Sequence, residues 1–216
     1  MEVQKRPSPS PTGAKVKLLD AALRIIRTKG YQASTVDDIC HAAGVSKGSF
    51  FHHFRSKEDL ALAAAEHFSA RADALFAAAS YRDANDARER LLGYVDLRSS
   101  LLRGDLPDFT CLLGTMVQET YATHPAIREA CDEHLRHHVS DVARDIADAK
   151  RTHAPQAPWS AESLGLFTQA VIQGAFILAK AHDDPDVAAE CLTHLRRYIE
   201  AQLPTPTDKH TSPKGD

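Results

Sequence analysis

The chain has 216 residues, of which 43% are hydrophobic, so it can bury the cores of one or two compact domains. Its net charge is −3, but residues 1–60 carry ten Lys or Arg against six Asp or Glu, and such a basic end suits contact with nucleic acid. The four cysteines include no C-x-x-C pair, which argues against a zinc finger and a disulfide scaffold.

Short helices are predicted in the first sixty residues, after a disordered tail over residues 1–11. The first helix covers residues 12–29, where apolar side chains recur on one face. Thr35 and Asp38 form a capping box at the start of a second helix, and Gly44 supplies the left-handed residue that ends it.

A third helix, over residues 47–53, follows a tight turn, and Phe50 and Phe54 mark its inward face. Helix, glycine-containing turn and helix is the layout of a helix-turn-helix domain, which we assign to residues 12–60. The alternative is a three-helix protein-docking module. We expect Thr35 and Lys57 to hold DNA phosphates, and Lys47, Ser49, Phe51 and His52 to face the major groove. The full set of expected DNA-binding residues is Thr35, Ser46, Lys47, Gly48, Ser49, Phe51, His52, His53 and Lys57.

A dense motif runs through these helices: Gly30-Tyr31, Thr35, AGVSKG over residues 43–48, and FRSK over residues 54–57. The pattern resembles the DNA-binding domain of TetR-family transcriptional repressors. Phe51 departs from it, because the family usually has Tyr there, with its hydroxyl on a phosphate. The resemblance implies a homodimeric repressor without a cofactor, released from a palindromic operator in double-stranded DNA by a small-molecule effector.

A second domain, also helical, is predicted over residues 61–203, followed by a disordered tail over residues 204–216. No segment alternates like a strand, so the fold is predicted to be all-α, with about nine helices. Because the helix that starts at Lys57 continues into this domain, it can couple a ligand site to the DNA reader. The expected helices cover residues 57–79, 87–102, 109–121, 125–151, 160–180 and 185–203, with a break at residues 104–107.

The helix over residues 164–180 is apolar on more than one face, so it needs two packing partners. One face fits the core of the subunit. The resemblance implies that the other, with the last helix, forms a four-helix bundle with a second copy. The expected dimer residues are Phe167, Val171, Phe176, Leu192, Leu195 and Tyr198.

Polar side chains on the central helices are candidates for an effector pocket. Cys111 resembles a cysteine that lines the pocket in one branch of the family and in some members senses electrophiles or oxidants, although Thr110 replaces the Gly that often precedes it. The alternative for Cys111 is a small buried apolar residue. The sequence does not specify the effector. The candidate pocket residues are Tyr94, Arg98, Cys111, Gln118, Tyr121, Gln169 and Gln173.

An alternative function is a helical metal-binding protein or enzyme, because His134, His138 and Asp141 share one face of a helix, with His137 beside them. The alternative is a solvated flank of the helix that carries extra histidines. No catalytic motif such as G-x-S-x-G or H-E-x-x-H is present, so we do not expect an enzyme. We find no apolar run of membrane-spanning length and no signal peptide, and therefore expect a cytoplasmic protein without a membrane partner. Activation instead of repression stays open.

Overall fold

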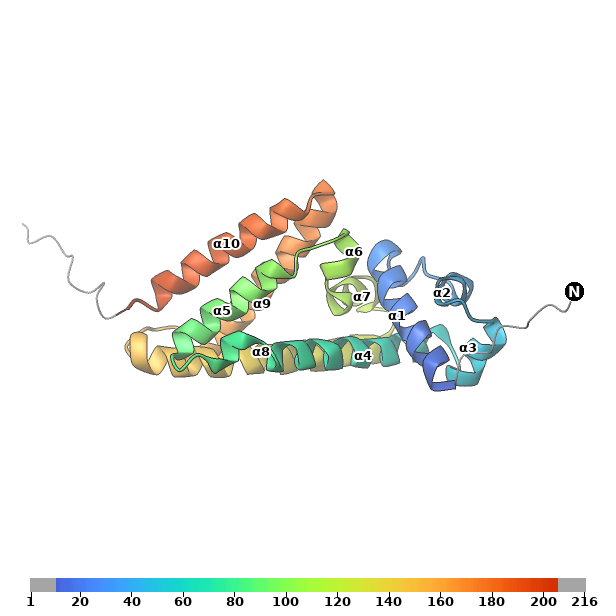
Figure 1. Cartoon of the computed structure of the whole chain (residues 1–216), viewed down its shortest axis with the longest axis horizontal. Helices are drawn as coiled ribbons and strands as arrows, with labels where there is room; N and C mark the ends of the chain where they lie inside the picture. Colours follow the sequence, from blue (N-terminus) through green and yellow to red (C-terminus); the bar gives the residue numbers. More distant parts are fainter. Residues whose placement is uncertain (1–10, 206–216) are drawn as a thin grey trace, which may run out of the picture. The chain divides into compact units, whose positions relative to one another are not determined.

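The structure is a computed structural model that describes residues 11–205, and these residues contain ten α-helices, one 3-10 helix and no strand (Figure 1). The predicted all-α fold is confirmed. The two predicted tails fall almost entirely outside the described residues, although Pro11 already begins the first helix. The elements are α1 (Pro11–Lys29), α2 (Val36–Ala43), α3 (Lys47–His53), α4 (Lys57–Ala77), η1 (Ser80–Asp83), α5 (Ala87–Ser100), α6 (Leu106–Phe109), α7 (Leu112–Thr120), α8 (Pro125–His153), α9 (Ala161–His182) and α10 (Pro185–Gln202).

The described residues form one α-helix more than the nine that the sequence predicts. The additional helix is α6, which lies where the sequence indicates a break followed by a single helix. The Asp108 carboxylate accepts a hydrogen bond from the backbone N–H of Asp105 at 3.0 Å, which starts the short helix. Thr110 then takes an extended conformation, so α6 and α7 are separate. Pro107 lies within the first turn of α6, where a missing N–H costs nothing.

The helices pack into two units, which we describe separately. The first contains the described residues up to Ala70 together with Leu112–Asp132, and the second contains Arg71–Cys111 and the described residues from Glu133. Residues 112–132, which the sequence assigned to the second domain, therefore pack with α1. Helices α4 and α8 each contribute residues to both units.

Specific contacts tie α7 to the first unit. The Glu119 carboxylate accepts a hydrogen bond from the backbone N–H of Gln32 at 2.8 Å. Gly30 lies beside it with φ +86°, and a Cβ there would meet the Glu119 carboxylate, so both the backbone angle and the space require glycine. The largest fully buried side chains of this unit are Leu18, Ile26, Ile39, Phe50, Leu60, Leu112, Met116 and Ile127.

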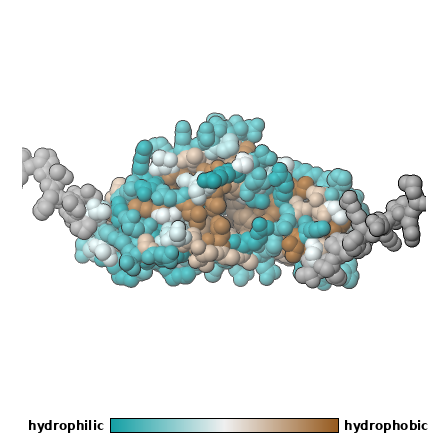
Figure 2. All heavy atoms as spheres, viewed as in Figure 1, coloured by the Kyte–Doolittle hydropathy of each residue, from teal (hydrophilic) through white to brown (hydrophobic). Residues whose placement is uncertain are grey.

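The second unit is built around α9, with α10 packed along it and against α5. Its largest fully buried side chains are Leu91, Ile146, Ile172 and Leu192. Figure 2 shows one face of the molecule, where hydrophilic side chains cover most of the surface and apolar ones are exposed in places.

Among the described residues, α9 is long and apolar enough to cross a membrane, which differs from the expectation drawn from the sequence. Its length and composition satisfy that test, but one face of the helix is occupied by the core of the second unit, where Ile172 and Ala179 are fully buried. The opposite face exposes Leu166 and Ile177. This helix therefore has a packed side and an uncovered apolar side.

Candidate DNA-binding face, interior cavity and apolar face

Helix α3 divides into a buried side and an exposed side, as its sequence predicts. Phe50 is 0% exposed and Phe54 is 3% exposed, whereas Phe51 is 54% exposed. On the outer side Lys47, Gly48 and His52 are exposed, and Ser49 and His53 are half-buried. We define the recognition face as Lys47, Gly48, Ser49, Phe51 and His52.

The turn before α3 sets the direction of this face. Gly44 ends α2 in the left-handed region with φ +63°, and the Ser46 hydroxyl caps α3 by accepting the N–H of Ser49 at 3.1 Å. The Lys47 ammonium lies 2.9 Å from the Asp37 carboxylate, and both side chains are well exposed. Since an exposed pair of this kind contributes about 0–1 kcal/mol, a phosphate or base edge can replace Asp37 at Lys47.

Thr35 and Asp38 form the predicted capping box at the start of α2. The Thr35 hydroxyl donates to the Asp38 carboxylate at 2.6 Å and accepts the Asp38 N–H at 3.1 Å. The hydrogen bond from Lys29, and after it the hydrogen bonds from Thr35, hold the pKa of the Asp38 carboxylate well below its usual range. The Thr35 hydroxyl, which the sequence predicts to hold a phosphate, is therefore already hydrogen-bonded within the helix cap.

Lys57 lies differently from its predicted role at a phosphate. Its ammonium donates to the carbonyls of Tyr31 at 3.0 Å and Ser34 at 3.1 Å, with Gln32 at 3.4 Å, and it lies 4.3 Å from the centre of the Tyr31 ring. Burial lowers the pKa of Lys57, and the charge of Glu119 opposes this shift. Three carbonyls of the turn between α1 and α2 thus take the donors of the ammonium, and Lys57 joins the start of α4 to that turn.

We expect Lys57→Met, which keeps most of the stem and removes the ammonium, to destabilise the protein by about 1–3 kcal/mol, because hydrogen bonds to a charged group are lost and the turn carbonyls lose their donor. Chemical denaturation followed by circular dichroism measures this. Lys47→Met is the matched control and is expected to change stability by less than about 0.5 kcal/mol. A Lys57→Met variant of unchanged stability but weaker DNA binding would restore the phosphate role.

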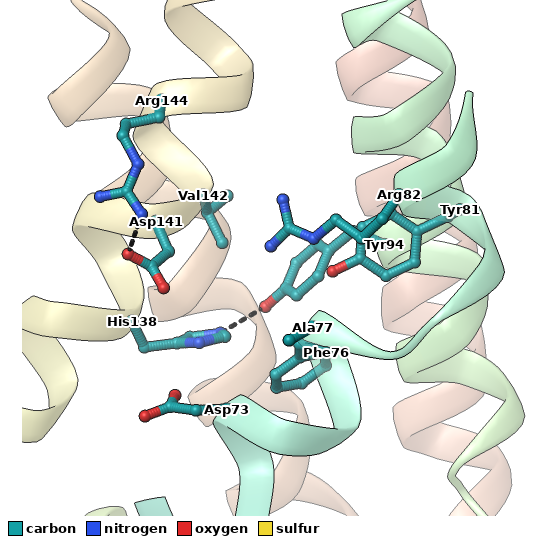
Figure 3. Close-up of a pocket in the computed structure, with 10 residues that line it drawn as sticks. All are labelled: Asp73, Phe76, Ala77, Tyr81, Arg82, Tyr94, His138, Asp141, Val142 and Arg144. Carbon is teal, nitrogen blue, oxygen red and sulfur yellow. Dashed lines mark hydrogen bonds and ion pairs between the residues drawn. The ribbon is translucent and has the colours of Figure 1, made fainter. Parts of the chain in front are cut away.

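A cavity of about 390 Å³ lies in the second unit, between the end of α4, η1, α5 and α8 (Figure 3). This volume lies in the range of small-molecule sites. The Tyr94 hydroxyl lies 2.8 Å from the His138 Nε2, and Figure 3 shows the two groups pointing toward each other. Aromatic and charged side chains share the lining, which consists of Asp73, Phe76, Ala77, Tyr81, Arg82, Tyr94, His138, Asp141, Val142 and Arg144.

Two of the side chains that line this cavity, Tyr94 and His138, are uncharged near neutral pH. Burial, helped by the positive charge of Arg98, lowers the pKa of His138 to about 3, so its imidazole is uncharged. Burial raises the pKa of the Tyr94 phenol, which keeps its proton. The Arg82 guanidinium forms an ion pair with the Asp145 carboxylate at 2.7 Å, and the same carboxylate lies 2.9 Å from Arg90.

Five of the seven predicted effector residues belong to the second unit. Tyr94 lines the cavity, and the Arg98 guanidinium carbon lies 6.0 Å from its ring. Cys111 and Gln169 are buried, and Gln173 is half-buried. The burial of Cys111 is consistent with the alternative given for it, a small buried apolar residue.

The structure separates the other two predicted residues, Gln118 and Tyr121, from this set. Both belong to the first unit, because the chain between α6 and α7 leads residues 112–132 onto α1. The Gln118 side-chain amide donates to the carbonyl of Gly114 at 2.8 Å, and Tyr121 is 63% exposed. Neither is therefore a pocket residue of the second unit.

Several lining residues were not predicted from the sequence. Phe76 lies near the end of α4, and Tyr81 lies in η1, between the helices expected over residues 57–79 and 87–102, where no periodicity marks it. The sequence indicates His138 only as a candidate metal ligand. Its side chain instead forms a hydrogen bond with Tyr94. The two residues are forty-four positions apart and lie on different helices, so sequence spacing does not reveal the contact.

The histidine cluster on α8 does not form a metal site in the structure. His138 bonds to Tyr94, while the His137 Nε2 lies 3.9 Å from Asp73 and 3.8 Å from Asp141. Within residues 11–205, no group of three or more His, Cys, Asp or Glu side chains is placed to hold a metal ion. The alternative based on His134 and His138 therefore has no supporting geometry in that part of the chain.

An apolar face, which we define as Leu166, Phe167, Ile177 and Leu178 of α9 with Tyr198 of α10, is uncovered in the second unit. These side chains are between 42% and 63% exposed. The Phe167 and Tyr198 rings lie 4.9 Å apart, so the two helices contribute to one surface. Gly174 has open space where a Cβ would be, so a partner can approach the backbone there.

The predicted dimer residues divide between this face and the core. Phe167 and Tyr198 belong to the face, and Val171 is half-buried. Phe176, Leu192 and Leu195 are 6%, 0% and 2% exposed, so the chain itself covers them and they offer little surface to a partner. The reason is that the apolar stripe of α10 packs against α9 and α5 of the same chain.

Two family models match this chain. The model described as bacterial regulatory proteins, tetR family, matches residues 18–64, and the model described as tetracyclin repressor-like, C-terminal domain, matches residues 87–195. The first match covers α2 and α3 with their connecting turn, and the second covers α5 to α9 and part of α10.

Individual relatives agree with these matches. The chain is 41% identical over 61 residues to the HTH-type transcriptional repressor AcnR of Corynebacterium glutamicum, covering 28% of this chain and 32% of that one. It is 24% identical over 194 residues to the repressor DhaR of Mycobacterium sp. (strain GP1), covering 90% and 94%. With several other curated relatives the match spans only 19% to 29% of their length.

Among solved structures, a regulatory protein TetR from Rhodobacter sphaeroides is 26% identical, with a TM-score of 0.77 over 88% of this chain and 99% of that one. The structural match and the two family-model matches therefore agree with one another. Since the C-terminal model alone matches half of the chain and the N-terminal model matches the helix-turn-helix, the chain belongs to the TetR family of bacterial regulatory proteins.

Proposed function

We propose that the protein is a homodimeric transcriptional repressor, which binds a palindromic operator and is released by a small molecule bound in its second unit. The observation that carries this proposal is the recognition face, where a buried Phe50 holds a short helix whose outer side presents a cation, hydroxyl and imidazole groups. Ser, Lys and His donors of this kind suit the base edges and phosphates of a major groove. In this proposal the protein binds DNA in the cytoplasm and does not catalyse a reaction.

The apolar face supports the dimeric part of the proposal. An uncovered patch of large apolar side chains on a monomer typically marks an interface. A symmetric pair of subunits presents two recognition faces, and each then reads one half of a palindrome. Half-sites one turn of DNA apart would be separated by about 34 Å.

The cavity and α4 support release by a ligand. Helix α4 starts at Lys57, which binds the turn between α1 and α2, and its last turn places Phe76 in the cavity lining, so one continuous helix belongs to both units. A ligand that favours one position of this helix shifts the orientation of the recognition face. A coupling free energy of about 1–3 kcal/mol changes operator affinity about 5- to 150-fold.

The test is a fluorescence anisotropy titration with the DNA upstream of the protein's own gene. Lys47→Ala and His52→Ala are each expected to weaken binding by about 1–3 kcal/mol, because each removes a groove contact from an exposed position. Arg103→Ala is the control, since Arg103 is an exposed cation of the second unit, and it is expected to bind normally.

Two outcomes would contradict the proposal. Affinities unchanged in both Lys47→Ala and His52→Ala would show that the recognition face does not read DNA. Failure of the wild-type protein to bind any fragment of that region better than unrelated DNA would favour the protein-docking alternative. Transcription in a reporter strain with the gene deleted then distinguishes repression from activation.

A further inference from the structure

Arg98, on α5, is a half-buried cation whose surroundings in the second unit are aromatic. Its guanidinium carbon lies 5.5 Å from the centre of the Phe76 ring, 6.0 Å from that of Tyr94 and 5.8 Å from that of Phe176. The three rings come from three different helices, α4, α5 and α9. The guanidinium is thus enclosed by side chains that the fold brings together from distant parts of the sequence.

Within residues 11–205, no carboxylate and no hydrogen-bond acceptor pairs with the Arg98 guanidinium, in contrast to the neighbouring arginines. Arg82 and Arg90 share the Asp145 carboxylate, at 2.7 Å and 2.9 Å. An arginine in a partly desolvated site normally has an anionic partner, because ring contacts compensate only part of the lost hydration of the charge. The planar donors of Arg98 are therefore available to an anion.

Two amide groups on α9 add unsatisfied polar atoms. Among the described residues, the Gln169 Oε1 and the Gln173 Nε2 are buried without a hydrogen-bond partner, and Gln169 as a whole is only 9% exposed. Gln173 precedes Phe176 by three residues and follows Gln169 by four, so these three side chains share one face of the helix. Because Phe176 contacts Arg98, this row of amides leads toward the guanidinium.

We propose that Arg98 binds the carboxylate of an aromatic organic acid, whose ring enters the cavity that Phe76 and Tyr94 line. A carboxylate matches the planar fork of a guanidinium and accepts two hydrogen bonds from it. The Gln173 amide is placed one helical turn from Phe176 and can donate to the same anion. This inference rests on the proposed function, because it names the chemical class of the effector.

The surroundings favour a single negative charge over a phosphate. Arg98 is the one cation of this ring cluster without an acid partner among the described residues, so a dianion would leave a charge uncompensated in an apolar site. The nearby Tyr94–His138 pair is hydrogen-bonded to itself and uncharged, and it adds no second cation. Aromatic walls favour a flat apolar body on the acid.

The test uses the full-length protein and three probes: benzoate, benzamide as the uncharged analogue of the same size, and acetate as the charge without the ring. Binding is measured by isothermal titration calorimetry on the wild type and on Arg98→Gln, Arg98→Lys and Arg103→Gln. Arg103→Gln is the matched control, because it removes the same charge from an exposed position on the same unit.

Benzoate is expected to bind the wild type and Arg103→Gln equally, and Arg98→Gln about tenfold or more weakly. Arg98→Lys keeps the charge without the fork and is expected to fall between them. Benzamide and acetate are expected to bind about tenfold or more weakly than benzoate. The proposal is overturned if benzoate does not bind the wild type, if Arg98→Gln binds it as well as the wild type, or if either analogue binds as well as benzoate.

Unfolding of the ligand-free variants separates binding from folding. Arg98→Gln is expected to retain the melting temperature of the wild type within a few degrees, because the arginine has no ion pair to lose; a collapse of the melting temperature would assign Arg98 to the core and overturn the proposal. The operator titration separates this inference from the proposed function. Benzoate that binds through Arg98 without releasing DNA refutes only the effector role, whereas normal operator binding without benzoate binding refutes only the acid site.

Discussion

Leu178→Glu is expected to convert the protein from a dimer to a monomer and to weaken operator binding by about a hundredfold or more. Leu178 is 47% exposed on the second unit, so a glutamate there is solvated in the monomer and leaves folding almost unchanged. In a two-fold symmetric dimer each substitution is present twice, and two carboxylates would be buried against apolar partners. A monomer carries one recognition face and loses the avidity of two.

Sedimentation equilibrium gives the oligomeric state, and anisotropy with the operator fragment gives the affinity. Ser140→Glu, at an exposed position of α8 outside the apolar face, is the charge control and is expected to remain dimeric. Gly174→Trp tests the face without adding charge, since a Cβ at Gly174 has no described residue within 4 Å and a large side chain there would obstruct a partner. A dimer that persists in both Leu178→Glu and Gly174→Trp would assign the interface to another surface.

Phe50→Ala is expected to destabilise the protein by about 3–5 kcal/mol, the cost of removing a large aromatic side chain from a closed core. Phe50 is 0% exposed and its ring lies 5.7 Å from that of Phe54, so the lost atoms leave a cavity beneath the recognition face. Because α3 has only seven residues, packing by these two rings is what holds it in place, and operator binding should be lost with it.

The adjacent residue is the matched control for this variant. Phe51→Ala removes an equal side chain from the exposed side of the same helix, where the ring is 54% exposed, and it is expected to change stability by less than about 1 kcal/mol while weakening DNA binding. Urea denaturation followed by circular dichroism gives the stability of both variants. Equal destabilisation by the two variants would contradict the division of α3 into a packed and a recognition side.

Local signals in the sequence determined the helix-turn-helix. Caps at Thr35 and Ser46, the left-handed Gly44 and the four-residue spacing of Phe50 and Phe54 act within a few residues, so each can be recognised without knowing the rest of the fold. The same applies to the all-helical content, since apolar periodicity is a property of each segment by itself. These features reappear in the structure where the sequence predicts them.

Only the tertiary structure decided which polar and apolar groups meet. The apolar stripe of α10 packs on its own chain, which buries Leu192 and Leu195 and leaves Leu178 and Tyr198 exposed. The carbonyls that bind Lys57 come from a turn some twenty-five residues earlier, and the rings around Arg98 come from three helices. Helical spacing identifies the faces of one helix, but it does not say which neighbour covers each face, because that depends on how all the helices pack together.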